Sequence, residues 1–243
     1  MIHFFRTEAG ILVPAITTRQ MREVDRLAIE ETGPNLYQMM ENAGRNLAIM
    51  AIDMIGDKWR SQEIIVLAGV GGNGGGGICA ARHLINRGAN VRVCVSNVNK
   101  LTPVPLYQRQ IYLAAGGLEL ELADLHKHAP ILIVDAMIGY SLQGPPRGNV
   151  LEMIHWANSC SAKTLSLDAP SGVDSTTGSL PGEKITPEQT MTLALPKTGL
   201  LPKLTGDLWL ADIGIPKSVY ERIDVPYISP FEETYFVKLA PQE

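Results

Sequence analysis

The sequence predicts a doubly wound α/β fold with a mostly parallel central sheet. Continuous apolar runs alternate with helical segments from residue 63 onward, as they do when parallel strands are buried on both faces. The first apolar run leads into residues 69–77, which contain seven glycines. We expect a single domain over residues 1–243, with an irregular N-terminal extension at 1–16 and a C-terminal tail at 217–243.

Two helices are expected ahead of the sheet. A threonine cap precedes a helix over residues 19–31, and the Gly33-Pro34 pair ends that helix. A longer helix is expected over residues 36–55. In this second helix Ala43 and Gly44 indicate close packing against a neighbouring element.

Strands and helices then alternate as far as residue 211. Segment length, β-branched content and flanking turn residues distinguish the strands from the helices. The expected strands are residues 64–67, 91–95, 118–122, 131–134, 164–167, 191–195 and 208–211. One expected helix starts at residue 78, and two others cover residues 106–115 and 150–158.

The glycine-rich stretch is expected to be a loop between a strand and a helix that begins at Ile78. Glycine has no Cβ to hold a ligand away from the backbone, and the first turn of a helix offers free N–H groups. Such a loop suits an anion, above all a phosphate. A Walker loop is excluded because no Gly-Lys-Ser/Thr follows, and a turn that binds nothing is the alternative.

Polar side chains follow three of the expected strands. Asn73 lies in the glycine stretch, Asp135 follows residues 131–134, and Asp168 precedes Ser171. Because the carboxyl ends of parallel strands lie at the same edge of a sheet, these residues are expected to lie close together. They would form a hard-cation site of oxygen ligands or an acid/base pair, and turn formation is the alternative.

Two lysines also follow expected strands. Lys100 comes after residues 91–95 and Lys197 after residues 191–195, so either side chain could face the same edge of the sheet. For Lys100 the alternative is an exposed, solubilising side chain.

Composition excludes several classes of protein. The net charge of −4 and the lack of a Lys/Arg cluster argue against nucleic-acid binding. Cys79, Cys94 and Cys160 are odd in number and lie in apolar surroundings, which suits buried thiols in a reducing compartment. No signal-peptide core and no apolar run of membrane length is present, so we expect a cytoplasmic protein without a membrane segment.

Six motifs stand in a specific order between Thr18 and Pro216. They are M-E-N-A-G at 40–44, G-V-G-G-N-G-G-G-G at 69–77, V-D-A-M-I-G at 134–139, L-D-A-P-S-G-V-D at 167–174, L-P-K-T-G at 195–199 and A-D-I-G-I-P at 211–216. By these motifs the chain resembles the NAD(P)H-hydrate epimerase family. The resemblance implies a Rossmann-like three-layer αβα sandwich, often a homodimer, that interconverts the R and S epimers of hydrated NADH or NADPH.

The resemblance also implies roles for individual residues. Asn73, Asp135 and Ser171 would hold a potassium ion, and Asp168 with Lys100 would form the acid/base pair. A separate NAD(P)H-hydrate dehydratase would be the functional partner. The implied substrate-binding residues are Gly72, Asn73, Gly74, Gly75, Gly76, Gly139, Tyr140, Ser141, Leu142, Gln143, Gly144, Pro145 and Asp168.

The glycine loop departs from the family, in which it usually reads N-N-G-G-D-G. Here Gly72 replaces the first asparagine and Gly76 replaces the aspartate. These changes favour an alternative, a catalytically impaired nucleotide-binding or scaffold module of the same fold, whereas the retained Asp168 and cation ligands favour an enzyme. A dinucleotide-dependent dehydrogenase is less favoured because no acidic residue closes a clear second strand about 20 residues after the glycines.

Overall fold

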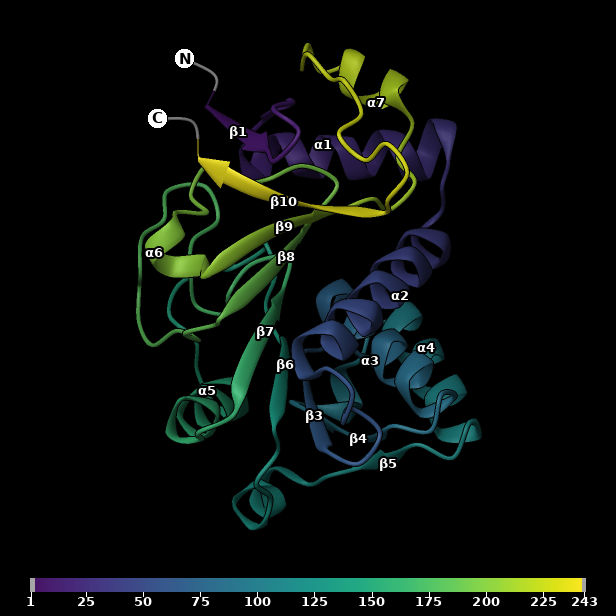
Figure 1. The fold of residues 1–243 in the computed structure, drawn as a ribbon, viewed down its shortest axis with the longest axis vertical. Coiled ribbons are helices and arrows are strands. Elements are labelled where there is room, and N and C mark those ends of the chain that lie inside the picture. Colours follow the sequence, from purple (N-terminus) through teal and green to yellow (C-terminus); the bar gives the residue numbers. More distant parts are fainter. Residues whose placement is uncertain (1–2, 242–243) are drawn as a thin grey trace.

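The computed structural model describes residues 3–241, which form a ten-stranded sheet with helices on both faces (Figure 1). The strand order is β2-β1-β10-β9-β8-β7-β6-β3-β4-β5, and every pairing from β9 to β5 is parallel. The mostly parallel sheet that the sequence predicts is therefore confirmed. The parallel strands are β3 (Glu63–Ala68), β4 (Asn90–Val95), β5 (Leu118–Glu119), β6 (Leu132–Ala136), β7 (Lys163–Leu167), β8 (Gln189–Leu193) and β9 (Asp207–Ala211).

The chain reverses its direction of winding at β3. It runs from β3 to β4 and β5 on one side, and then returns to place β6, β7, β8 and β9 on the other side. Strand β3 consequently pairs with both β4 and β6. In open parallel sheets, ligands bind in the crevice at the carboxyl ends of the strands where this reversal occurs.

The expected irregular N-terminal extension and part of the C-terminal tail are instead strands, which corrects the prediction. Strands β1 (Phe4–Thr7) and β2 (Leu12–Pro14) form a hairpin, and β10 (Phe236–Pro241) lies between β1 and β9. All these pairings are antiparallel, and they extend one edge of the sheet (Figure 1). The segments are too short for a clear alternation, and their pairing joins the two ends of the chain, which no local pattern reveals.

Both of the first two helices start at a side-chain cap, and the threonine cap predicted for the first is confirmed. Helix α1 (Thr18–Leu27) starts with a capping box between Thr17 and Gln20, and a π-helical turn, η1 (Ala28–Thr32), extends it. Helix α2 (Leu36–Ile55) starts with a capping box between Asn35 and Gln38. The remaining helices are α3 (Gly72–Ile85), α4 (Pro103–Ala114), α5 (Asn149–Ser159), α6 (Pro202–Thr205) and α7 (Lys217–Glu221), with 3-10 turns η2 (Val98–Lys100) and η3 (Leu122–Lys127).

Alternate residues of β3 face two separate cores, which defines the three layers. Ile64 and Val66 pack with residues of α2 and α3, whereas Ile65 and Leu67 pack with Met153 and other residues of α5. In Figure 1, α2, α3 and α4 lie on one side of the sheet and α5 on the other. The three-layer sandwich that the resemblance implies is therefore confirmed.

Helix α3 begins within the glycine stretch at Gly72, six residues before the expected start at Ile78. The glycines permit close packing rather than only a turn. A Cβ at Gly75 would lie 2.3 Å from Met40 Sδ, and one at Gly77 would lie 2.4 Å from the Cβ of Ala136. On the facing helix, a Cβ at Gly44 would lie 2.5 Å from that of Cys79, so the expected close packing of α2 is confirmed.

The cysteines are free, as predicted: Cys79 and Cys94 are buried and Cys160 is partly buried. Cys79 lies near Glu41 and His83, and Arg82 binds Glu41 at 2.6 Å. Burial raises the pKa of the Cys79 thiol to about 12, so the thiol is protonated at neutral pH. Across residues 3–241, no helix is long and apolar enough to span a membrane.

Candidate functional site

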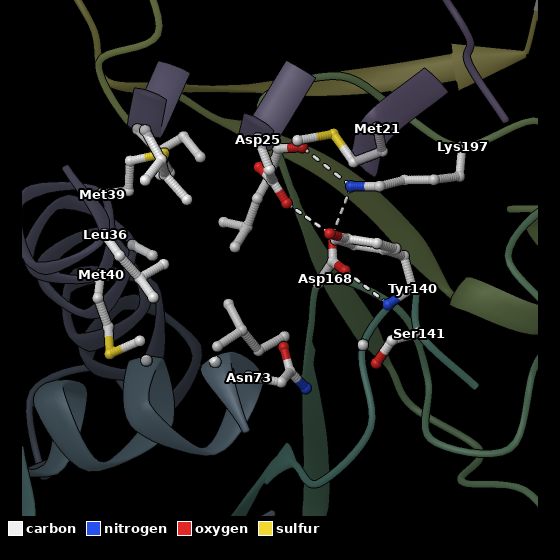
Figure 2. A pocket seen from close by; sticks show the side chains of 18 residues that line it. Met21, Asp25, Leu36, Met39, Met40, Asn73, Tyr140, Ser141, Asp168 and Lys197 are labelled. Carbon is white, nitrogen blue, oxygen red and sulfur yellow. Dashed lines mark hydrogen bonds and ion pairs between the residues drawn. The ribbon is translucent and has the colours of Figure 1, made fainter. Parts of the chain in front are cut away.

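A cavity of about 340 Å³ lies at the carboxyl ends of the central strands, where the direction of winding reverses. Helices α1 and α2 form one wall, and the first turn of α3 and the loops after β6, β7 and β8 form the other (Figure 2). Its polar lining side chains are Asp25, Asn73, Tyr140, Ser141, Asp168 and Lys197, and its apolar lining includes Met21, Ile29, Leu36, Met39, Met40 and Ala43. Such a mixture suits a ligand with both apolar and charged parts.

Asp168 and Lys197 form a buried ion pair on the sheet side of the cavity. Lys197 Nζ lies 2.5 Å from Asp168 Oδ1, and the lysine side chain has no exposed area. The ammonium group also donates to Leu193 O at 3.0 Å and to Thr192 Oγ1 at 3.3 Å. The second oxygen of Asp168 accepts the backbone N–H of Tyr140 at 2.8 Å, so this carboxylate is fixed at both oxygens.

The backbone at Asp168 is in a conformation that side-chain-bearing residues rarely adopt, with a φ of 66°. Such conformations cost on the order of 1–3 kcal/mol and cluster at functional sites. The backbone N–H of Asp168 donates to Met191 O at 2.7 Å, which holds the turn in place. The fold thus maintains a strained turn that presents the carboxylate to the cavity.

Asp25 is a functional candidate that the sequence analysis did not identify. It projects from α1 toward the cavity, and its carboxylate accepts a short hydrogen bond from the Tyr140 hydroxyl (Figure 2). Burial raises the pKa of Asp25, although the Tyr140 hydrogen bond opposes this shift. One signal was available: Asp25 lies four residues after Met21, so an acidic residue shares the apolar face of its helix.

Asp135 and Ser171 form a buried oxygen-rich group beside the cavity. Asp135 accepts four hydrogen bonds: from Ser171 Oγ at 2.5 Å, Ser166 Oγ at 2.8 Å, Ser171 N at 2.9 Å and Met137 N at 3.3 Å. Burial raises the pKa of Asp135, and these hydrogen bonds act against the shift. Among the described residues, no lysine or arginine lies within ion-pair distance of this carboxylate.

Asn73 lies beside Gly139, in the loop whose Ile138 contacts Ser171. Ile138 N donates to Ser171 Oγ at 2.9 Å, and a Cβ at the adjoining Gly139 would lie 3.1 Å from Asn73 Oδ1 and 2.8 Å from Asp168 Oδ2. The Asn73 amide nitrogen is buried and has no hydrogen-bond partner among residues 3–241. The amide, carboxylate and hydroxyl oxygens together match the ligand preference of a hard cation.

Not all of the residues implied to bind substrate line the cavity. Gly72, Asn73, Gly76, Gly139, Tyr140, Ser141 and Asp168 do so. Gly74 and Gly75 are buried where α3 packs, and Leu142, Gln143, Gly144 and Pro145 lie outside the cavity lining. Lys100 is exposed at the end of η2 and does not reach the cavity, whereas Lys197 does.

The first turn of α3 faces the cavity without a side-chain cap. Its N-cap residue is Gly71, and Gly72 and Asn73 line the cavity. The free N–H groups and the positive end of the helix dipole therefore face the space available to a ligand. An anionic group is favoured at this position.

Comparisons with known proteins agree with this architecture. The family model described as YjeF-related protein N-terminus matches residues 36–199. The crystal structure of the yeast protein ynu0 has the same fold, with a TM-score of 0.75, 24% identity, and coverage of 92% of this chain and 99% of that one.

Relatives in sequence are closer. The NAD(P)H-hydrate epimerase of Dehalogenimonas lykanthroporepellens is 48% identical over 240 residues, which cover 98% of both chains. The bifunctional NAD(P)H-hydrate repair enzyme Nnr of Salinibacter ruber is 33% identical over 229 residues, which cover 86% of this chain and 42% of that protein. The chain belongs to the NAD(P)H-hydrate epimerase family, as the resemblance in its sequence indicated.

Proposed function

We propose that this protein interconverts the R and S epimers of hydrated NADH and NADPH, as the name of its 48% identical relative states for that protein. The observation that carries the proposal is the buried Asp168–Lys197 pair in a cavity that also receives the uncapped end of α3. The pair supplies proton transfer, and the helix end supplies an anion site for the phosphates of a dinucleotide.

The reaction requires a proton donor beside a hydroxyl group. The hydroxyl of the hydrate stands on a ring carbon next to nitrogen, so its protonated form leaves as water and gives a cation that the nitrogen stabilises. Water then returns from either face, and ring opening followed by reclosure is a second route. In the Asp168–Lys197 pair, whose Oδ1 and Nζ lie 2.5 Å apart, the Lys197 ammonium provides the proton and the Asp168 carboxylate stabilises the positive charge that develops.

Lys197 replaces Lys100 in the proposed acid/base pair. Both lysines follow strands, but Lys100 is exposed outside the cavity and only Lys197 contacts Asp168. The proposal therefore assigns proton transfer to Asp168 and Lys197, and assigns no role to Lys100.

Substrate phosphates are proposed to lie against Gly72, Asn73 and Gly76 and against the loop that begins at Gly139. Ser141 from this loop also lines the cavity and offers a hydroxyl donor. The apolar wall of α1 and α2, with Met21, Met39 and Met40, is available for a ring.

We also propose that Asn73, Asp135 and Ser171 hold a potassium ion. The fully buried Asp135 carboxylate has no cationic side-chain partner among the described residues, and the hydroxyl oxygens of Ser166 and Ser171 lie beside it as possible cation ligands. A bound cation would compensate the buried charge and hold the loops after β3, β6 and β7 together. Potassium polarises its ligands weakly, so its role is to order these loops.

Removal of potassium should lower both stability and activity. A ligand that binds only the folded state adds about 2.7 kcal/mol to the unfolding free energy at 100 times its dissociation constant, and so raises the melting temperature. We expect a higher melting temperature in potassium chloride than in tetramethylammonium chloride of equal ionic strength, and no such difference for Asp135→Asn. Equal melting temperatures and rates of the natural protein in the two salts would contradict the potassium site.

Restoring the family residues at the two departures tests the scaffold alternative. At Gly72, the nearest atom to an added Cβ is Met40 Cε at 4.0 Å, so Gly72→Asn should change stability by less than about 0.5 kcal/mol. At Gly76, an added Cβ would lie 2.8 Å from Leu167 Cδ2, so Gly76→Asp requires Leu167 to shift. We expect the natural protein to be active and the double variant to differ from it by less than about tenfold. Activity that appears only in the double variant would favour the scaffold module.

The proposed function is tested with a single separated epimer of hydrated NADH. Purified protein in potassium buffer should convert it to the other epimer faster than buffer alone, as followed by chromatography. A rate equal to that of buffer alone would refute epimerase activity. The homodimer, the cytoplasmic location and a separate dehydratase stay predictions, and relatives named as bifunctional repair enzymes support the existence of a second repair activity.

A further inference from the structure

The cavity contains a second carboxylate, that of Asp25, which is not part of the Asp168–Lys197 ion pair. Asp25 comes from α1, and Asp168 comes from the turn after β7, so the two carboxylates belong to different walls (Figure 2). One oxygen of Asp25 accepts the Tyr140 hydroxyl. No residue within 3–241 donates a hydrogen bond to its other oxygen.

Asp25 has no counterion in the described part of the chain, although charged groups surround it. The Lys197 ammonium acts on Asp25 electrostatically, but it donates its hydrogen bonds to Asp168, Thr192 and Leu193. Asp168 and the Tyr140 phenol face it from the other wall, and Arg22 acts on Tyr140 from α1. An unpaired, partly buried carboxylate reduces stability, so its position in a cavity indicates a chemical role.

Tyr140 connects the two carboxylates. Its backbone N–H donates to Asp168 Oδ2 at 2.8 Å, and its hydroxyl donates to Asp25. Its ring lies beside the Lys197 ammonium, 5.7 Å from the centroid. This one residue fixes Asp25 relative to Asp168 and Lys197, and leaves the other Asp25 oxygen free for a ligand.

We propose that Asp25, oriented by Tyr140, is a second catalytic acid/base that serves the ring face opposite to that served by Asp168 and Lys197. The inference rests on the proposed epimerase function. On one face the Asp168–Lys197 pair gives a proton to the hydroxyl, the C–O bond breaks, and water leaves. On the other face a water molecule forms the new C–O bond and gives a proton to Asp25. The reverse reaction uses the protonated Asp25 as the acid. In the forward direction Asp25 returns its proton to the Asp168–Lys197 pair through solvent before the next turnover, so protons and electrons balance with no further reactant.

Epimerisation of one epimer in ¹⁸O-labelled water distinguishes the reactions at the two faces of the substrate ring. In the natural protein, inversion should place ¹⁸O in the product hydroxyl. In Asp25→Asn, inversion should fall by about 100-fold or more. Loss and return of water on the Asp168 face should continue in this variant, and should place ¹⁸O in the starting epimer above the spontaneous rate. Asp53→Asn, a change at an exposed position of α2, is the matched control and should behave as the natural protein.

Two further measurements exclude a merely structural role. Because the folded-state pKa of Asp25 is raised, its ionisation costs stability as pH rises through that pKa. The neutral Asp25→Asn variant should therefore melt at or above the natural protein at neutral pH. In Tyr140→Phe the pKa of Asp25 should rise further, since the lost hydrogen bond lowers it, and the acid limb of the pH–rate profile should move to higher pH.

The outcomes distinguish this inference from the proposed function. Exchange without inversion in Asp25→Asn, at an undiminished melting temperature, supports the inference. Equal loss of exchange and inversion, an unmoved pH profile in Tyr140→Phe, or inversion in the natural protein without ¹⁸O uptake overturns it and leaves the epimerase intact. No inversion by the natural protein above the spontaneous rate overturns both.

Discussion

Replacement of Asp168 by asparagine should reduce epimerisation by about 10² to 10⁴-fold. The change removes the negative charge that pairs with the Lys197 ammonium and stabilises the developing cation, while it keeps the shape of the side chain. Asparagine also tolerates the left-handed backbone at this position, where φ is 66°. Rates are measured with a single epimer as substrate, and spontaneous conversion is subtracted.

The stability of this variant needs a control of its own. Asp168→Asn leaves the Lys197 ammonium buried without a counterion, and loss of one partner of a buried pair costs about 3–5 kcal/mol. The double variant Asp168→Asn, Lys197→Met removes both charges and should recover much of that stability, as thermal unfolding would record. It should remain as inactive as the single variant. Full activity in either variant would exclude this pair from the chemistry.

The parallel half of the sheet was predictable because its information is local. Strands buried on both faces are predominantly apolar and β-branched, so residues 64–67, 131–134 and 164–167 differ clearly from the helices between them. The polar residue that follows each strand then falls at the carboxyl edge by geometry alone. For that reason Asp135 and Asp168 could be placed together without a structure.

The features that the sequence analysis missed depend on contacts between segments that are distant in the chain. Strand β10 lies between β1 and β9, so the irregular ends of the chain become strands only when they meet. The two lysines gave the same local signal after a strand, but Lys197 is buried and Lys100 is exposed. The turn that leads to Lys197 contains Ala194 at a φ of 63°, which no local pattern reveals. Asp25 belongs to the first helix. The rule that ligands bind at the carboxyl ends of parallel strands concerns strands and the loops that follow them, so it could not identify Asp25.

The glycine stretch shows how one composition serves two purposes. Its glycines indicated a ligand loop, and Gly72, Asn73 and Gly76 do line the cavity. Gly74, Gly75 and Gly77 instead meet Gly69, Met40 and Ala136, at distances that a Cβ would make too short. The sequence cannot separate these purposes, because glycine is selected in both cases for the absence of a side chain.

Replacement of Gly69 by alanine should therefore destabilise the protein strongly, by about 3 kcal/mol or more. The added Cβ would lie 1.9 Å from the backbone oxygen of Met137 and 2.9 Å from its carbonyl carbon, and backbone cannot rotate away as a side chain can. Gly69 N also donates to Ala136 O at 3.0 Å, so the clash would separate the ends of β3 and β6. Denaturant unfolding measures the loss.

Gly71→Ala is the matched control for this change. It lies two residues further along the same stretch, its φ of −104° suits any residue, and no atom lies within 4 Å of an added Cβ. We expect a change in unfolding free energy of less than about 1 kcal/mol, since the loss of a glycine N-cap and the stiffer unfolded chain act in opposite directions. Equal stabilities for Gly69→Ala and Gly71→Ala would contradict the close approach of β3 to the loop after β6. The close approach of these two segments places Asn73 beside Gly139 and Asp168. If the segments separated, the proposed cation ligands and the acid/base groups would both move apart.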